Sequence, residues 1–168
     1  MRVLGIDPGT IRIGLGVLES QGKRYQLVGF ESVAMTKNLS LPERLKEIYA
    51  AVQKSIERYL PEVVELENVF FGKDVRALVK IGEARASAML AAADRKIPVV
   101  EYPPARIKQA ISGNGRASKI QVQQMVKFLL QLKTPPPTDA ADALAAAFCH
   151  LQSQNLRIPS QHVRIPVG

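Results

Sequence analysis

The spacing of the apolar residues changes once along this chain, near residue 40, and the change restricts what the chain can fold into. Before it, short apolar stretches alternate with turns that contain Gly or Pro, which predicts three strands at residues 2–6, 11–18 and 25–33. After it, apolar residues recur at helical spacing between Ser40, a predicted N-cap, and Pro61. An antiparallel meander followed by helices belongs to the mixed α/β class.

The rest of the chain alternates strands with helices. A buried strand is predicted to end at Glu67, and a fifth strand covers residues 98–102. Helices are predicted from Asp74 to about Lys96, around Arg106 and Lys108, from Ser118 to about Leu132, and from Thr138 to about Ser153. The order β, β, β, α, β, α, β, α is that of the ribonuclease H-like fold, a mixed five-stranded sheet flanked by helices. We expect one domain at residues 1–154 and a flexible tail at 155–168.

The helix predicted from Asp74 to about Lys96 is unusually thin. Its small residues are Gly82, Ala84, Ala86, Ala88, Ala91 and Ala92. Small side chains allow another helix to approach closely, so this helix is our candidate for a dimer interface, with Ala88 at the seam. The alternative is that the same helix packs flat on the sheet.

Several features place the chain in a reducing compartment and away from membranes. Cys149 is the only cysteine, which excludes a disulfide within one chain. The first seven residues carry charge at Arg2 and Asp7, which leaves no apolar stretch for a signal peptide. No apolar run reaches the length of a membrane span. We therefore expect a cytoplasmic protein.

Charge is distributed unevenly. The formal net charge is +8, and residues 102–168 hold eight Lys and Arg but only two acids, Asp139 and Asp142. A basic half that keeps two carboxylates three positions apart is typical of a phosphate-binding surface with a metal site set in it.

Two further acids stand where predicted strands end. Asp7 closes the first strand and Glu67 the fourth, so both are expected at one edge of the sheet. The competing interpretations are a turn-forming Asp before Pro8 and a solvated strand end at Glu67.

Asp139 and Asp142 lie on one face of a predicted helix, where like charges repel. The helix dipole favours acids in a first turn, which is the alternative explanation, but it does not explain why these acids stand alone. Hard oxygen ligands suit Mg²⁺, and Mn²⁺ could substitute. Together with Asp7 and Glu67, these residues could hold two metal ions against a phosphodiester.

Three strings stand in order along the chain: Gly5-Ile6-Asp7-Pro8-Gly9, Glu67-Asn68-Val69-Phe70 and Asp139-Ala140-Ala141-Asp142-Ala143-Leu144-Ala145. Taken together, they resemble the RuvC family of Holliday-junction resolvases over about residues 1–150. The resemblance implies a ribonuclease H-like homodimer that cuts four-way DNA junctions with Mg²⁺ and leaves 5′-phosphate and 3′-hydroxyl ends. It also makes all four acids metal ligands, and it suggests the RuvA and RuvB proteins as partners.

The same resemblance assigns residues to DNA. Lys108 and Lys119 match basic residues beside the scissile phosphate, and Phe70 matches an aromatic residue that stacks on an unpaired base. Arg76 and Arg116 are further candidate DNA contacts. The alternatives are a solvated helix face for the lysines and core packing for Phe70.

Three other functions compete with this one. The first string also resembles the phosphate motif of actin-like sugar kinases and chaperone ATPases, but that fold needs two such domains. Another ribonuclease H-like nuclease would share the acids and differ in substrate. A non-catalytic junction-binding protein would share the fold, and the complete acidic quartet argues against it.

Overall fold

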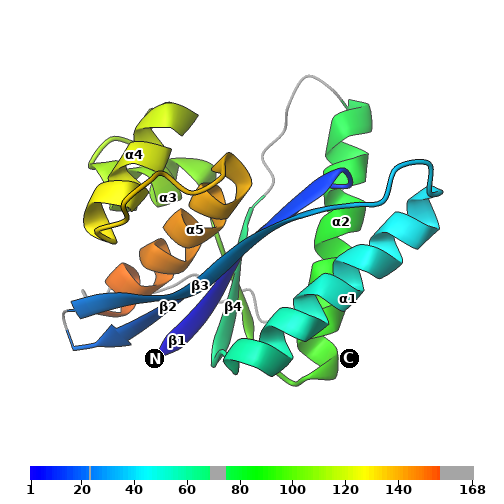
Figure 1. Ribbon diagram of the computed structural model, residues 1–168, viewed down its shortest axis with the longest axis horizontal. Coiled ribbons are helices and arrows are strands. Elements are labelled where there is room, and N and C mark those ends of the chain that lie inside the picture. Colours follow the sequence, from blue (N-terminus) through cyan, green and yellow to red (C-terminus); the bar gives the residue numbers. More distant parts are fainter. Residues whose placement is uncertain (23, 69–74, 156–168) are drawn as a thin grey trace.

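In the computed structural model, which describes residues 1–22, 24–68 and 75–155, a five-stranded sheet separates two layers of helices (Figure 1). The strands are β1 (Arg2–Asp7), β2 (Arg12–Gln21), β3 (Arg24–Ala34), β4 (Val63–Glu67) and β5 (Val99–Tyr102). The helices are α1 (Leu41–Tyr59), α2 (Val75–Asp94), α3 (Pro104–Ser112), α4 (Lys119–Leu129) and α5 (Thr138–Asn155). The predicted order of elements and the mixed α/β class are confirmed. The tail was predicted to begin at residue 155, but Asn155 is the last residue of α5; residues 156–168 and Phe70 lie outside the described residues.

The strands are arranged in the order β3-β2-β1-β4-β5. β1 pairs with β2, and β2 with β3, in antiparallel fashion, which is the predicted meander. β4 then pairs parallel to β1, and β5 parallel to β4. Parallel neighbours end at the same edge of a sheet, so the carboxyl ends of β1 and β4 lie side by side.

Two element boundaries differ from expectation by about three residues. β2 continues to Gln21 because the hairpin pairs Gln21 with Arg24. α4 ends at Leu129 rather than near Leu132, because Gln131 takes a left-handed conformation with φ of 52°. The predicted caps are present: Ser40 and Ser118 each form a capping box with the residue three positions later.

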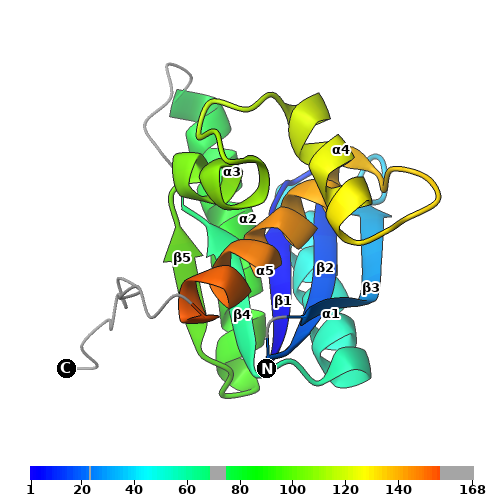
Figure 2. The ribbon, with the colours of Figure 1, turned by 90° about the vertical axis from the view of Figure 1, so that its left-hand side faces the viewer.

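The sheet buries one core on each face. α1 and α2 cover one face, and α3, α4 and α5 cover the other (Figures 1 and 2). α5 lies directly on β1 and β2, because glycines at the contact let the backbones meet. A Cβ at Gly5 would stand 2.0 Å from the carbonyl oxygen of Ala143, and one at Gly14 2.0 Å from that of Asp139. These glycines fix the start of α5 above the carboxyl end of β1.

The small residues of α2 are divided between two faces of the helix. Ala84, Ala88, Ala91 and Ala92 are fully buried in the core that α1 and the sheet share. The placement of Ala88 at a dimer seam is therefore wrong, because its side chain has no surface to offer a partner. The sheet-packing alternative holds for this face. The opposite face of α2, formed by positions 75, 79, 82, 86, 90 and 93, is exposed to solvent.

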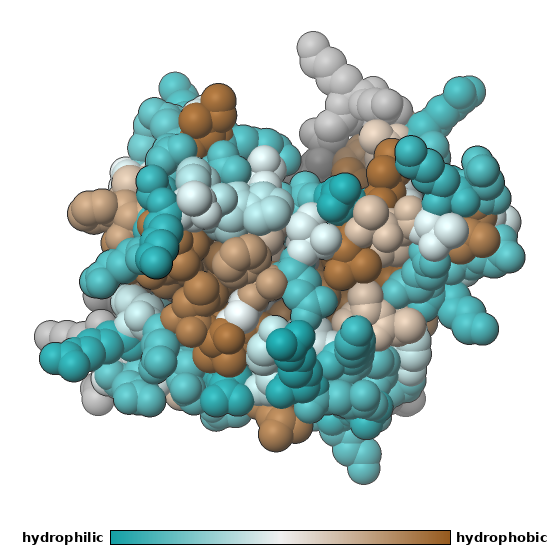
Figure 3. Space-filling model, viewed as in Figure 1, coloured by the Kyte–Doolittle hydropathy of each residue, from teal (hydrophilic) through white to brown (hydrophobic). Residues whose placement is uncertain are grey.

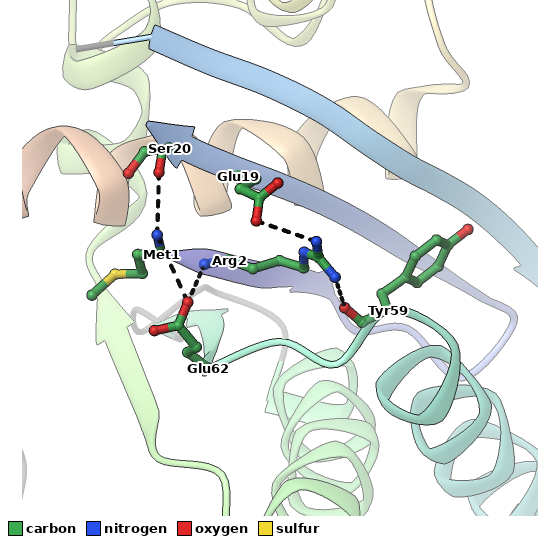
Figure 4. A network of polar contacts seen from close by, with 6 residues as sticks. All are labelled: Met1, Arg2, Glu19, Ser20, Tyr59 and Glu62. Carbon is green, nitrogen blue, oxygen red and sulfur yellow. Dashed lines mark hydrogen bonds and ion pairs between the residues drawn. The ribbon is translucent and has the colours of Figure 1, made fainter. Parts of the chain in front are cut away.

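A network of polar contacts ties the sheet together at the end opposite to Asp7 (Figure 4). The guanidinium of Arg2 donates to the main-chain oxygen of Tyr59 at 2.6 Å and to Glu19 at 3.2 Å. The main-chain N–H of Arg2 donates to Glu62 at 2.8 Å. β1 is thereby anchored at its start to β2 and to the connection between α1 and β4.

None of the helices in the described part of the chain has the length and apolar character that a membrane span needs.

Candidate active site

The ends of β1 and β4 bring two acids together as the sequence predicts. Ile6 of β1 pairs with Leu66 of β4, so the residues that follow them, Asp7 and Glu67, lie side by side at the same edge of the sheet. Successive side chains of a strand point to opposite faces of the sheet. Because Ile6 and Leu66, the preceding residues, are buried on the face covered by α1 and α2, both acids project toward the face that carries α5. Asp142, one turn into α5, lies above the same edge.

These acids line one small cavity together with both of the predicted lysines. The cavity measures about 130 Å³, and its walls are Asp7, Glu67, Asp142, Lys108, Lys119, Pro104, Ile107 and Val122. The lysines come from α3 and α4, the two helices that pack against α5. Five of the six residues proposed for catalysis therefore converge on one site although they come from five different elements.

The carboxyl groups of the cavity resist ionisation. Burial, followed by the charge of Asp142, raises the pKa of Asp7 to about 7. Burial likewise raises the pKa of Glu67 and, although Lys119 opposes it, that of Asp142. Lys119 donates to Asp142 at 3.3 Å, and the charge of Asp142 raises the pKa of the lysine, which stays protonated at neutral pH. Burial and, to a lesser degree, mutual repulsion disfavour the charged carboxylates, and a bound cation would offset both.

Asp139 is turned away from this cavity. Its carboxylate accepts a hydrogen bond from the hydroxyl of Ser32 at 3.0 Å and lies 3.5 Å from Nε of Arg12. Sequence reasoning overlooked both partners, since Arg12 and Ser32 belong to the meander, more than 100 residues earlier in the chain. Nothing in their local sequence marks them.

The donors suit a hard divalent cation, although their present spacing does not form a finished site. Carboxylate oxygens are the ligands that Mg²⁺ prefers. No cluster of three or more Asp, Glu, His or Cys side chains in the described part of the chain stands ready to hold a metal ion. Binding would require the side chains of Asp7, Glu67 and Asp142 to draw together, which a cation favours because it cancels their repulsion.

Arg85 is a second residue that sequence reasoning missed. From the buried face of α2 its guanidinium donates to the main-chain oxygen of Glu67 and to the carboxylate of Glu101 on β5. The next main-chain N–H, that of Asn68, donates to Tyr102 at 2.9 Å. The peptide group after Glu67 is thus held from both sides. An arginine on the buried side of an alanine-rich helix was the available signal.

The remaining candidates lie outside the cavity. Arg76, in the first turn of α2, and Arg116, just before α4, are both exposed. His150, on α5, is buried and shares a hydrogen bond with the hydroxyl of Tyr102 at 3.1 Å.

The raised pKa of Asp7 predicts how the stability of the metal-free protein depends on pH. A carboxyl whose pKa rises on folding stabilises the fold at low pH and loses that contribution as pH rises, here between about 4 and about 7. The loss is up to about 4 kcal/mol before solvent screening is considered. With chelator present, Asp7→Asn should therefore melt well above the parent protein at pH 8 and close to it at pH 4. An equal difference in melting temperature at both pH values would contradict the raised pKa.

Comparison with known proteins gives a consistent result. The family model described as crossover junction endodeoxyribonuclease RuvC matches residues 3–150. The chain is 47% identical to a protein of that name from Dehalococcoides mccartyi over 151 residues, which cover 89% of this chain and 90% of the relative. It is 45% identical to the one from Thermotoga maritima over 160 residues, covering 94% and 95% of the two chains.

Solved structures agree with the sequence relatives. Thermus thermophilus RuvC in complex with a Holliday junction substrate superposes with a TM-score of 0.88 at 36% identity, over 95% of this chain and 98% of that one. The yeast mitochondrial Holliday junction resolvase Ydc2 superposes with a TM-score of 0.61 at 13% identity, over 93% and 80% of the two chains. The second likeness is one of fold alone.

Proposed function

The chain belongs to the RuvC family of crossover junction endodeoxyribonucleases, and on that premise we propose that it resolves four-way DNA junctions by paired, symmetric nicks. The observation that carries this proposal is the convergence of Asp7, Glu67, Asp142, Lys108 and Lys119 on one cavity. We propose residues 1–154 as the nuclease unit and all four acids, including Asp139, as its metal ligands.

The family is metal-dependent, and we propose Mg²⁺ as the metal, two ions per site, with Mn²⁺ as a substitute. When bound, the ions supply an activated water and stabilise negative charge on the departing oxygen. In the reaction, a water oxygen bonds to phosphorus, the bond from phosphorus to the 3′ oxygen breaks, and the products carry 5′-phosphate and 3′-hydroxyl ends.

The residues of the chain prepare this step. Asp7 and Glu67 are held on adjacent strand ends, so only their side chains need to move to hold a cation beside the scissile phosphate. Lys119, kept charged by Asp142, and Lys108 present positive charge where the phosphate gains negative charge. Arg76, Arg116 and Phe70 are proposed as DNA contacts farther from the cut.

The proposed reaction requires that the protein form a dimer. Symmetric nicks in two strands require two active sites related by a two-fold axis, and each chain supplies one set of acids, so we propose a homodimer. The exposed face of α2 is its proposed interface. We further propose RuvA and RuvB as partners that deliver the junction, and the cytoplasm as the place of action.

The function is tested by nicking of a synthetic four-way junction. With Mg²⁺ we expect paired nicks and ligatable duplex products, and with Ca²⁺ or chelator we expect binding without nicking. Equal cutting of linear duplex or of an RNA–DNA hybrid would favour another ribonuclease H-like nuclease. Tight binding without cleavage in Mg²⁺ and Mn²⁺ would favour a junction-binding architectural protein.

The two lysines give a more specific prediction. Lys108→Ala and Lys119→Ala should each lower the single-turnover cleavage rate by about 10- to 100-fold, because charge at the scissile phosphate acts most strongly in the transition state. Junction affinity in Ca²⁺ should fall less than about threefold. Lys133→Ala, an exposed lysine outside the cavity, serves as the control. A loss of affinity equal to the loss of rate would reassign that lysine to general backbone contact.

A further inference from the structure

Asp139 stands between two sets of partners. On one side, Ser32 and Arg12 hold its carboxylate. On the other, Asp142 follows one turn later on the same face of α5 and reaches into the cavity that Asp139 does not line. Asp139 and Asp142 thus lie on one face of α5 but contact different groups.

The backbone around Asp139 has no comparable freedom. Gly14 on β2 lies so close that a Cβ there would overlap the main-chain oxygen of Asp139. Ser32 pairs directly with Gly14 across the β2–β3 ladder, and Arg12 stands two residues before it on the same face. Backbone packing therefore fixes where Asp139 meets Arg12 and Ser32, and a change of partner would involve the side chains alone.

Arg12 lies at the rim of the site, with its guanidinium partly open to solvent. Its side chain is 48% exposed, at the same sheet edge as Asp7. Asp139 is its single ion-pair partner among the described residues, while Nη1 donates to Ser32 at 3.1 Å. A guanidinium binds phosphate with the same planar donors that it offers a carboxylate. DNA that brings a phosphate to the acids brings its neighbours within reach of this rim.

We propose that Arg12 binds a DNA phosphate next to the scissile one by exchanging its partner Asp139, and that the released carboxylate completes the metal site. The inference rests on the proposed function and adds a DNA ligand and an order of events to it. Without DNA or metal, Asp139 stays with Arg12 because the cavity already holds three acids that repel it. With DNA, the phosphate takes the donors of Arg12, and a cation becomes the best partner left for Asp139.

The exchange predicts that DNA and metal bind cooperatively, since each favours the arrangement that the other needs. It also predicts that Arg12 weakens metal binding in the absence of DNA. We would measure Mn²⁺ binding to the full chain by electron paramagnetic resonance, without DNA. Arg12→Gln should bind Mn²⁺ about fivefold more tightly than the parent, and its affinity for a four-way junction in Ca²⁺ should fall severalfold.

Two comparisons separate the exchange from a simple loss of charge. Arg24→Gln removes the same charge at the far end of the same hairpin and should leave Mn²⁺ affinity unchanged. In an Asp139→Asn background, Arg12→Gln should no longer tighten Mn²⁺ binding, because the gain must pass through that carboxylate.

Three results would overturn the proposal: unchanged Mn²⁺ affinity in Arg12→Gln, weaker Mn²⁺ binding in that variant, or a gain that persists in the Asp139→Asn background. None of these depends on cleavage. A parent protein that binds junctions without nicking them would refute the proposed function. The Mn²⁺ titrations would still test whether Asp139 exchanges Arg12 for a metal ion.

Discussion

Asp7→Asn should lower the rate of junction cleavage by a factor on the order of 10³ or more while junction affinity changes less than about threefold. The substitution removes a charged metal ligand and leaves the shape of the site intact. Affinity is retained because phosphate contacts come from Lys and Arg side chains, and removing a negative charge from the cavity reduces repulsion of DNA. Glu67→Gln and Asp142→Asn should behave alike, since all three line the same cavity.

The measurement pairs single-turnover cleavage in Mg²⁺ with gel-shift affinity in Ca²⁺ on one junction. Glu57→Gln is the matched control, because Glu57 is an exposed acid on α1 whose one ion-pair partner within the described part of the chain is Arg95. Each variant should also be checked for folding in chelator, where Asp7→Asn is expected to be the more stable protein at pH 8. A variant that cuts within tenfold of the parent rate would remove that acid from the metal site.

The convergence of Asp7 and Glu67 was predictable because it depends on strand order and strand ends. Alternating and helical spacings give the elements, and a parallel pairing of β1 with β4 then places both acids at one edge. Asp142 was predicted for the site together with Asp139, because helical spacing places both acids on one face of α5. The lysines needed the family resemblance, since an exposed lysine on a helix is ordinary.

The orientation of Asp139 was beyond the sequence. Helical spacing along α5 predicts that Asp139 and Asp142 share a face. It does not predict that Ser32 and Arg12 contact Asp139 and not Asp142. That contact depends on the close approach of α5 to β2 at Gly14, a consequence of three-dimensional packing. Side-chain partners that come from distant strands leave no local pattern.

The two faces of α2 show a different limit. The helix carries small residues all round, so alanine content alone did not separate the face that packs on the sheet from the face that meets solvent. Burial separates them: positions 84, 88, 91 and 92 are buried, whereas positions 75, 79, 82, 86, 90 and 93 are exposed and all apolar or glycine. The second set follows helical spacing along the full length of α2.

This exposed stripe is where we place the dimer interface. Val75, Val79 and Leu90 are 69%, 54% and 60% exposed, large values for aliphatic side chains that line up on one helix. A Cβ at Gly82 would meet nothing within 4 Å, so a partner helix can approach closely there. Figure 3 shows hydrophobic and hydrophilic residues side by side on the half of the molecule that carries α1 and α2.

Leu90→Arg should convert the protein into a folded monomer that makes single, uncoupled nicks. The side chain lies on the surface of one chain, so the charge costs the monomer little, whereas at a two-fold interface two arginines would be buried face to face without partners. Sedimentation should report half the parent mass at micromolar concentration. On a supercoiled cruciform plasmid the parent should produce linear product, and the variant should accumulate the nicked circle.

Two further variants make this result interpretable. Phe128→Arg places the same charge at a side chain that is 74% exposed on α4, away from α2, and should remain dimeric. Ala88→Arg, on the buried face of α2, should instead unfold, because an arginine has no space in that core. A Leu90→Arg protein that stays dimeric and still makes paired nicks would exclude this face of α2 as the interface. The need for two active sites would then direct the search to another surface of the chain.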